Sequence, residues 1–171
     1  MNPLKSTSWL AENIREVKIL DATWHMPKSN RNAFNEYQEC HIENSIFFDL
    51  DKNSKKGTIL PHMLPELEKW EKIVSKLGIE KNDHIVIYDN SDVLSACRCW
   101  FTFLYFGHDI KLVSVLDGGL KKWKLENRPI TKVNTSLSQT NYIASVKENL
   151  VVDLKQVNQN IKDKKFCLVD A

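Results

Sequence analysis

Four short apolar runs, separated by segments with helical periodicity or turn residues, constrain the fold of this chain more than any other feature. The runs are VKILDA at 17–22, SIFFD at 45–49, HIVIY at 84–88 and KLVSVL at 111–116. Nearly continuous apolar runs of this length are typical of strands that are buried on both faces of a parallel sheet. Because helical segments alternate with these runs, we predict an α/β fold: a doubly wound, mainly parallel sheet with helices on both faces.

The helices are predicted from apolar spacing and from capping residues. After Pro65 the apolar residues recur with i, i+3, i+4 spacing through Leu77, which predicts a helix that ends at Gly78. Further helices are predicted from a cap at Thr7 or Ser8 to Arg15, from about Ser95 to Phe106, and after Gly118 around Trp123. The tryptophans, Trp24 among them, are expected in the core.

The size and charge of the chain exclude several classes of protein. Its 171 residues are enough for one ordinary domain with a core and too few for two. The formal net charge is only +2, and no basic stripe is interleaved with aromatic residues, so we expect no nucleic acid partner. No signal peptide is recognisable and no run approaches membrane-spanning length, so we expect no membrane contact and a cytoplasmic location.

No cysteine pattern indicates a metal or a cofactor, and we expect neither. Cys40, Cys97, Cys99 and Cys167 form no CxxC motif and no zinc-like pairing with histidine, so we expect reduced, mostly buried thiols. Cys97 would lie in the first turn of a helix, where the pKa of a thiol can fall. It lies outside the preceding loop, however, and packing is its expected role.

The chain changes character after residue 130. Residues 131–149 are polar and without a regular period, which is typical of an extended linker. A helical segment, DLKQVNQNIKDKK, follows, and FCLVDA at 166–171 repeats the pattern of VKILDA, so it predicts a fifth strand. An internal echo of this kind suggests that a second copy of the domain is beginning, and we interpret the sequence as truncated.

The loop after HIVIY is placed where α/β proteins bind anions and carry nucleophiles, between the carboxyl end of a strand and the start of a helix. It opens with Asp89, Asn90, Ser91 and Asp92, which supply two carboxylates and no cysteine or glycine. We therefore predict that this loop caps the following helix and carries no nucleophile.

Several motifs occur in the order and spacing of one family over nearly the whole chain. They are LDATWHMP, EYQECHIENSIFFDLD, LPHMLP, IVIYD with SACRCW, and VLDGGLKKW. On these motifs the chain resembles the two-domain sulfurtransferases of the rhodanese superfamily, especially those that use 3-mercaptopyruvate or thiosulfate. It departs from that family at HIENS (41–45), where the family has HIPGA, and at SACR (95–98), where the family has SAPR.

The resemblance implies a sulfurtransferase built from two similar domains. Residues 1–130 would form the N-terminal, non-catalytic rhodanese-like domain, residues 131–149 the interdomain linker, and residues 150–171 the beginning of the second domain. A cysteine of that second domain would take sulfane sulfur from the donor, carry it as a persulfide and pass it to a thiol or to cyanide. The expected partners are this small-molecule donor, the acceptor and the chain's own second domain. Asp89 takes the position of the cysteine, so this chain alone is expected to be inactive.

Asp51 and His62 are the candidate site residues. Pro61 and Pro65 flank His62 and would fix the direction of its imidazole. The resemblance implies that Asp51, His62 and a serine of the second domain form a charge relay near the catalytic cysteine. The alternative is that His62 only makes hydrogen bonds at the domain interface. Arg98 is expected to form an interdomain or capping salt bridge.

Two further functions are open alternatives. A stand-alone, inactive rhodanese domain could serve as a protein-binding or regulatory module, although a finished domain should not end by starting another strand. A phosphatase relative with the same fold is disfavoured, because the chain contains no Cys-x5-Arg motif.

Overall fold

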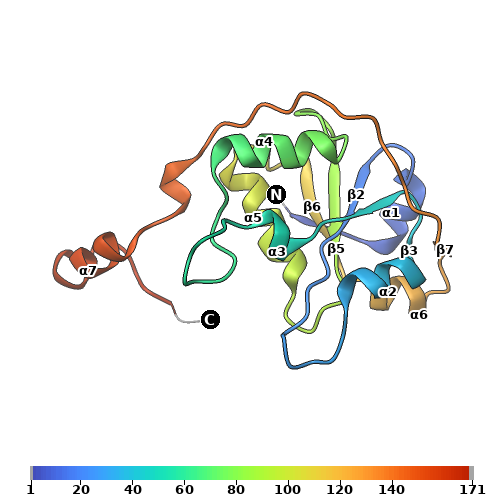
Figure 1. Ribbon diagram of the computed structural model, residues 1–171, viewed down its shortest axis with the longest axis horizontal. Helices are drawn as coiled ribbons and strands as arrows, with labels where there is room; N and C mark the ends of the chain where they lie inside the picture. Colours follow the sequence, from blue (N-terminus) through green and yellow to red (C-terminus); the bar gives the residue numbers. More distant parts are fainter. Residues whose placement is uncertain (1, 170–171) are drawn as a thin grey trace.

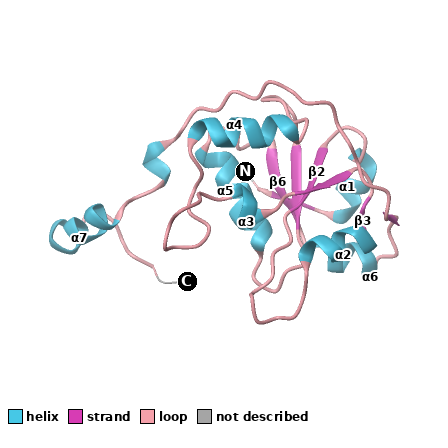
Figure 2. Cartoon of the chain, viewed as in Figure 1, coloured by secondary structure: helices cyan, strands magenta, loops and turns pink. Residues whose placement is uncertain are grey.

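Five parallel strands form the central sheet. The computed structural model describes residues 2–169 of the 171-residue chain. Neighbouring strands are all parallel, and their order is β1 (Leu4–Lys5), β6 (Val113–Leu116), β5 (Ile85–Tyr88), β2 (Lys18–Asp21) and β4 (Ser45–Phe47). Figure 2 shows the strands side by side in the middle of the molecule. The predicted α/β fold with a parallel sheet is confirmed.

Helices cover both faces of the sheet, as predicted. In Figure 1, α1 (Thr7–Asn13), α2 (Ala33–Glu39) and α6 (Gly119–Leu125) lie on one side, and α3 (Leu50–Asn53), α4 (Leu67–Lys76) and α5 (Ser95–Tyr105) lie on the other. All four residues of β5 are inaccessible to solvent. The unbroken apolar run in the sequence reflects this burial, because a strand with one solvated face would alternate apolar and polar residues.

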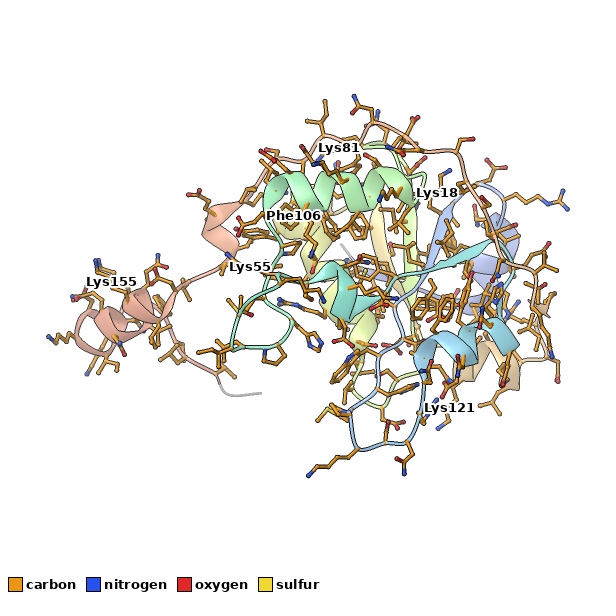
Figure 3. All side chains as sticks on the ribbon, viewed as in Figure 1. Lys18, Lys55, Lys81, Phe106, Lys121 and Lys155 are labelled. Atoms are coloured by element: carbon orange, nitrogen blue, oxygen red, sulfur yellow. The ribbon has the colours of Figure 1, made fainter. Side chains whose placement is uncertain are left out.

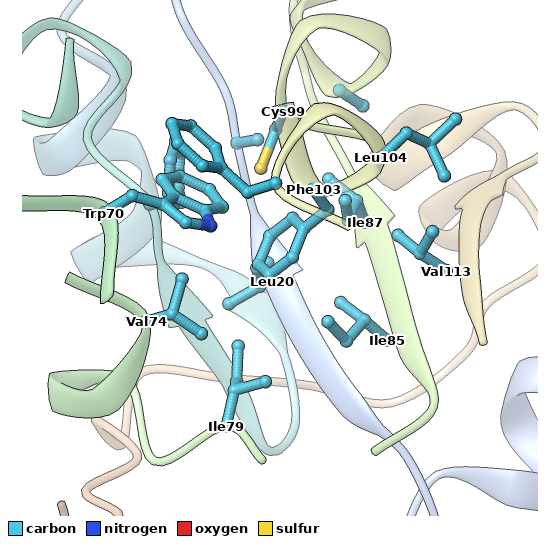
Figure 4. Packing of buried hydrophobic residues seen from close by; sticks show 14 of the residues in the cluster. Leu20, Trp70, Val74, Ile79, Ile85, Ile87, Cys99, Phe103, Leu104 and Val113 are labelled. Atoms are coloured by element: carbon cyan, nitrogen blue, oxygen red, sulfur yellow. The ribbon is translucent and has the colours of Figure 1, made fainter. Parts of the chain in front are cut away.

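The larger apolar cluster lies between the sheet and helices α4 and α5. Figure 4 shows Trp70 of α4 packed against Phe103 of α5, close to Leu20 of the sheet. The ring centroid of Trp70 is 4.9 Å from that of Phe103 and 5.0 Å from that of Phe106. Burial of one large apolar side chain contributes about 1.5–3 kcal/mol, so this cluster fixes α5 firmly to the sheet.

The structure adds short elements that the sequence patterns do not predict. They are β1, α2, α3 and an antiparallel pair formed by β3 (His41–Ile42) and β7 (Ile130–Thr131). The cap of α1 is Ser6, whose hydroxyl accepts the N–H of Trp9, and not the predicted Thr7 or Ser8. These elements span two to seven residues, which is too short for a hydrophobic period to be recognised.

Residues 140–147, within the predicted linker, form an extended segment that we call the strap. In Figure 1 the chain passes over α4 here. The backbone N–H of Ser145 donates to the carbonyl of Phe106 at 3.0 Å, and that of Lys147 donates to the carbonyl of Tyr105 at 2.8 Å. The strap is therefore bonded to the C-terminal end of α5. The division into a domain at 1–130 and a linker at 131–149 stays a prediction.

Tyr142 anchors the strap in the apolar cluster and is only 1% exposed. Its hydroxyl lies 3.1 Å from Nδ1 of His108, and Nε2 of His108 lies 3.0 Å from the carbonyl oxygen of Asp83. Because that carbonyl can only accept, Nε2 of His108 donates to it, and Nδ1 accepts the hydroxyl proton of Tyr142. Tyr142 is thus the buried anchor of the strap, and Ala144 and Val146 pack against the same cluster.

The C-terminal residues lie apart from the sheet. The strap leads into the single 3-10 turn η1 (Glu148–Leu150) and then into α7 (Leu154–Asp163), which Figure 1 shows well away from the other helices. The strand predicted at 166–171 is wrong for residues 166–169, which are exposed and form no strand; residues 170 and 171 lie outside the described part. A strand needs a partner backbone, and no described strand lies beside this segment.

Charged side chains are spread over the surface. Figure 3 shows Lys18, Lys55, Lys121 and Lys155 projecting from different parts of the chain, so the positive charge does not gather on one face. Every helix in residues 2–169 is too short or too polar to cross a membrane.

The burial of Tyr142 predicts that the strap stabilises the domain. Tyr142→Ala should lower the free energy of unfolding by about 3 kcal/mol, because it leaves a cavity where an aromatic ring was buried. The neighbouring Ile143→Ala is the matched control: this side chain is 65% exposed, and its removal should change the free energy by less than about 0.5 kcal/mol. Urea denaturation of the two variants measures the difference, and equal effects would mean that the strap is only loosely attached.

Candidate functional site

Asp51 and His62, the two site residues predicted from the sequence, are in direct contact. Asp51 lies in the first turn of α3, which Asp49 caps by accepting the N–H of Lys52 at 2.9 Å. His62 lies in the following loop with a φ of 54°, a left-handed conformation that few residues other than glycine adopt. Nε2 of His62 is 2.8 Å from Oδ1 of Asp51. The expected hydrogen bond is present, and its role in catalysis stays a prediction.

This contact fixes which nitrogen of His62 carries the proton. An ionised carboxylate can only accept hydrogen bonds, so Nε2 donates to Asp51. In the neutral ring Nδ1 then keeps its lone pair and is the nitrogen that can take a proton. The pair therefore has the form of a base oriented by a carboxylate, which is half of the usual triad.

Arg98 of α5 holds the backbone of His62. Its Nη2 donates to the carbonyl oxygen of His62, which supports the strained loop. The capping salt bridge predicted for Arg98 is wrong, because in the described part of the chain no carboxylate pairs with this guanidinium. An interdomain salt bridge stays a prediction. Burial lowers the pKa of Arg98, but a guanidinium remains charged at neutral pH.

A surface hollow of about 480 Å³ opens beside these groups. Its walls include Trp24, Pro61, His62, Leu94 and Arg98. Leu94 is 68% exposed on its rim. The hollow thus combines apolar walls with an imidazole and a guanidinium, and this combination suits a small anionic molecule or the surface of another domain.

The carboxylate of Asp89 lies in the loop after β5 at the N-terminus of α5, which we call the anion position because an anion could bind the free N–H groups there. Its Oδ2 accepts the backbone N–H of Ala96 at 2.6 Å and lies 3.4 Å from the hydroxyl of Ser95, both in the first turn of α5. The predicted capping role is confirmed. Burial raises the pKa of Asp89, although these hydrogen bonds oppose the effect. The carboxylate fills the place at the helix N-terminus that a thiolate or a bound anion would take.

The cysteines offer no activated thiol in this loop. Cys97 is exposed on α5, and partial burial together with the charge of Asp89 raises its pKa, so it is a neutral thiol at pH 7. The expectation of mostly buried thiols is wrong: only Cys99 is buried, while Cys40 is half-buried and Cys167 is exposed. All four are free.

A network around Glu36 of α2 holds the loop closed and was missed by the sequence analysis. Arg31 binds both oxygens of Glu36 at 2.7 Å, and the side chains of Asn90 and His25 contact the same carboxylate at 3.1 and 3.2 Å. Arg31 also donates to the backbone carbonyl of Asn90 at 3.2 Å. The residues come from three separate segments, and only the fold brings them together.

A second buried carboxylate lies beneath the loop. Asp21, at the carboxyl end of β2, is 2% exposed and accepts the N–H and the hydroxyl of Thr23. The hydroxyl of Thr23 in turn accepts the N–H of Asn90 at 2.9 Å. Burial raises the pKa of Asp21 to about 6, and the charge of Asp89 adds to the effect.

Trp24 lies at the edge of the apolar cluster, beside the hollow. It was expected in the core, but it is only partly buried, lines the hollow and donates its Nε1–H to Oδ2 of Asp51 at 3.1 Å. Its position three residues beyond β2 was the available signal, because the carboxyl ends of parallel strands are where sites are built.

The fold and these contacts define a class: an α/β domain that keeps the platform of an active site and carries a carboxylate where a nucleophile would stand. In residues 2–169 no three side chains of His, Cys, Asp or Glu are grouped so that they could hold a metal ion. The chain belongs to the rhodanese-like domain family, which it matches over residues 6–126.

The chain is similar to several named sulfurtransferases and to a solved structure. Thiosulfate/3-mercaptopyruvate sulfurtransferase 2 of Arabidopsis thaliana is 38% identical over 99% of this chain and 56% of the relative. Human 3-mercaptopyruvate sulfurtransferase is 34% identical over 98% of this chain and 59% of the relative. The crystal structure of SseA from Escherichia coli, described as a 3-mercaptopyruvate sulfotransferase, superposes with a TM-score of 0.89 at 30% identity and covers 96% of this chain and 63% of SseA. The chain thus spans little more than half the length of these relatives.

Because its pKa is raised, the buried Asp21 carboxylate is predicted to lower the free energy of unfolding at neutral pH. The folded-state pKa of about 6 lies above the value of about 3.9 expected in the unfolded chain, so the folded state binds more protons between these values. The contribution of Asp21 to stability should therefore fall as pH rises from about 4 to about 6 and then stay level.

Asp21→Asn removes this titration while keeping an oxygen that can accept from Thr23. Relative to the unmodified chain, the variant should gain about 2 kcal/mol of stability between pH 4 and pH 7, measured by urea denaturation. Asp92→Asn, whose side chain is 93% exposed, should show no such change. A difference between Asp21→Asn and the unmodified chain that is constant with pH would contradict the assignment.

Proposed function

We propose that this chain is the supporting N-terminal half of a two-domain sulfurtransferase. The enzyme moves sulfane sulfur from 3-mercaptopyruvate, or from thiosulfate, to a thiol or cyanide acceptor. The sulfur is carried as a persulfide on a cysteine of a second rhodanese-like domain. A cytoplasmic location is also proposed; one relative from Arabidopsis thaliana is named as mitochondrial.

The observation that carries the proposal is the occupied anion position. Asp89 binds the first turn of α5 where a persulfide-forming cysteine would need the same N–H groups. A carboxylate cannot carry transferable sulfur, so the nucleophile must come from elsewhere. The hollow beside His62 offers a surface for the domain that supplies it, and this domain is the proposed partner.

The proposed chemistry has two steps. The cysteine thiolate attacks the sulfur of 3-mercaptopyruvate, the carbon–sulfur bond breaks, and its electron pair leaves on carbon as the enolate of pyruvate, which takes a proton. The acceptor, a thiolate or cyanide, then attacks the outer sulfur of the persulfide and releases the cysteine as thiolate. With thiosulfate as donor, the sulfur–sulfur bond breaks and sulfite leaves.

Asp51 and His62 have a supporting role in this scheme. Nδ1 of His62 accepts a proton from a hydroxyl supplied by the second domain, and the Asp51 carboxylate orients the ring and stabilises the imidazolium. Arg98, near the same hollow, favours a negatively charged donor.

The first consequence is that the 171-residue chain alone lacks sulfurtransferase activity. With 3-mercaptopyruvate or thiosulfate as donor and cyanide as acceptor, the chain should match the background without enzyme. Mass spectrometry should find no persulfide on Cys97, because its thiol is neutral at pH 7. Turnover that disappears in Cys97→Ser would make Cys97 the nucleophile and overturn the proposal.

The second consequence concerns His62 in the two-domain protein. His62→Ala should lower kcat with 3-mercaptopyruvate by about 10²–10⁴-fold, which is the usual contribution of a general base, while the fold is retained. Circular dichroism checks the fold, and His84→Ala, a histidine outside the hollow, is the control. Unchanged kinetics in His62→Ala would leave only a structural role for the pair.

A further inference from the structure

The indole of Trp24 contacts both members of the Asp51–His62 pair. We propose that Trp24 is a positioning residue for this pair: it fixes the Asp51 carboxylate so that the second oxygen is presented to His62. The inference rests on the proposed function, in which His62 accepts a proton.

The two carboxylate oxygens of Asp51 bind different side chains. Oδ1 of Asp51 binds Nε2 of His62 at 2.8 Å, and Oδ2 accepts the indole N–H of Trp24 at 3.1 Å. The side chain of Asp51 is 65% exposed, so packing alone does not hold it. Without the indole donor the carboxylate could turn about its last bond and exchange His62 for water.

The rings of Trp24 and His62 are also in direct contact. The indole of Trp24 and the imidazole of His62 meet edge to face, with centroids 4.7 Å apart and an angle of 88° between the planes. This is a favoured arrangement for aromatic rings, and it limits rotation of the imidazole. Trp24 therefore constrains His62 directly as well as through Asp51.

Trp24 is itself anchored to α5 through Ser95. Its backbone N–H donates to the hydroxyl of Ser95 at 3.1 Å, and this hydroxyl donates to the carbonyl of Ala22 at 2.7 Å. Ser95 is buried in the first turn of α5, which the apolar cluster fixes to the sheet. Trp24 thus links the pair to α5, although Asp51 lies on the four-residue helix α3 and His62 on a loop.

A simple packing role for Trp24 makes a different prediction. If the ring only filled space, Trp24→Phe would retain most of the contact area and would have little effect on catalysis. If the N–H orients the carboxylate, the same variant loses the donor to Oδ2 of Asp51, and no other donor to this oxygen lies within residues 2–169.

The kinetic test uses the two-domain protein with 3-mercaptopyruvate and cyanide. Trp24→Phe should lower kcat about tenfold, which is typical of the loss of a hydrogen bond to a charged group, and should change KM by less than about twofold. In an Asp51→Asn background the effect of Trp24→Phe should fall to less than about twofold, because phenylalanine keeps the ring contact with His62 and loses only the N–H bond to that carboxylate. An undiminished effect in that background would overturn the inference. Trp9→Phe is the matched control, since Trp9 lies near His84, with ring centroids 5.2 Å apart, and outside the hollow.

A spectroscopic test on the 171-residue chain does not depend on activity. The proton on Nε2 of His62 should be observable by nitrogen-15 NMR at low temperature, because the hydrogen bond to Asp51 slows its exchange. It should broaden or disappear in Trp24→Phe and persist in Trp9→Phe. Persistence of this signal in Trp24→Phe would overturn the inference.

The two tests separate the inference from the proposed function. If His62→Ala is slow and Trp24→Phe has normal kinetics, the inference fails and the function stands. If His62→Ala has normal kinetics and the Nε2 proton is still lost in Trp24→Phe, the proposed role of His62 as a base fails and the structural role of Trp24 stands.

Discussion

Hydrogen bonds made by the first turns of α5 hold Asp89, Trp24 and His62 of the candidate site. Asp89 accepts the N–H of Ala96, Ser95 holds the backbone of Trp24, and Arg98 holds the carbonyl of His62. The helix is itself packed against the sheet by a cluster of buried aromatic rings. A site carried by loops thus obtains its geometry from a rigid element, which is the arrangement that accurate positioning of catalytic groups requires.

Two buried carboxylates lie at the carboxyl ends of β2 and β5, and their burial is unfavourable for the charged form. Asp21 and Asp89 are both buried, and burial raises the pKa of each. Two unit charges at about 4 Å interact by about 1 kcal/mol in water and by more where solvent is excluded, so an anionic sulfur donor would be repelled from this loop. The loop is therefore unsuited to the chemistry that its backbone geometry otherwise supports. Under the proposed function, this repulsion favours a donor site in the neighbouring hollow, which Arg98 lines.

The sequence predicted the strands and helices whose burial leaves a regular pattern of apolar residues. The apolar runs predicted four of the five strands of the sheet, and the spacing after Pro65 predicted α4, because burial on one or two faces leaves a period in the sequence. Motif resemblance selected Asp51 and His62, which the fold brings to 2.8 Å. The role of Trp24 and the network around Glu36 could not be predicted, because their partners lie 27 and 54 residues away in the chain. The attachment of the strap was also not predicted, since its apolar residues have no regular period and its backbone bonds are made to distant residues.

The attachment of the strap has a mechanical consequence. Residue 148 is the point where the chain leaves the domain, and the last bonds before it join the strap to the carbonyls at the end of α5. A tension applied to the chain after residue 148 would reach the C-terminal end of α5 and would be shared by several hydrogen bonds and by the buried ring of Tyr142. The helix that bears Ser95 and Arg98 would thus share this load with α4, to which Tyr142 and Ala144 of the strap are bonded. A displacement of the following segment would reach the hollow through α5, which contributes Ser95 and Arg98 to it.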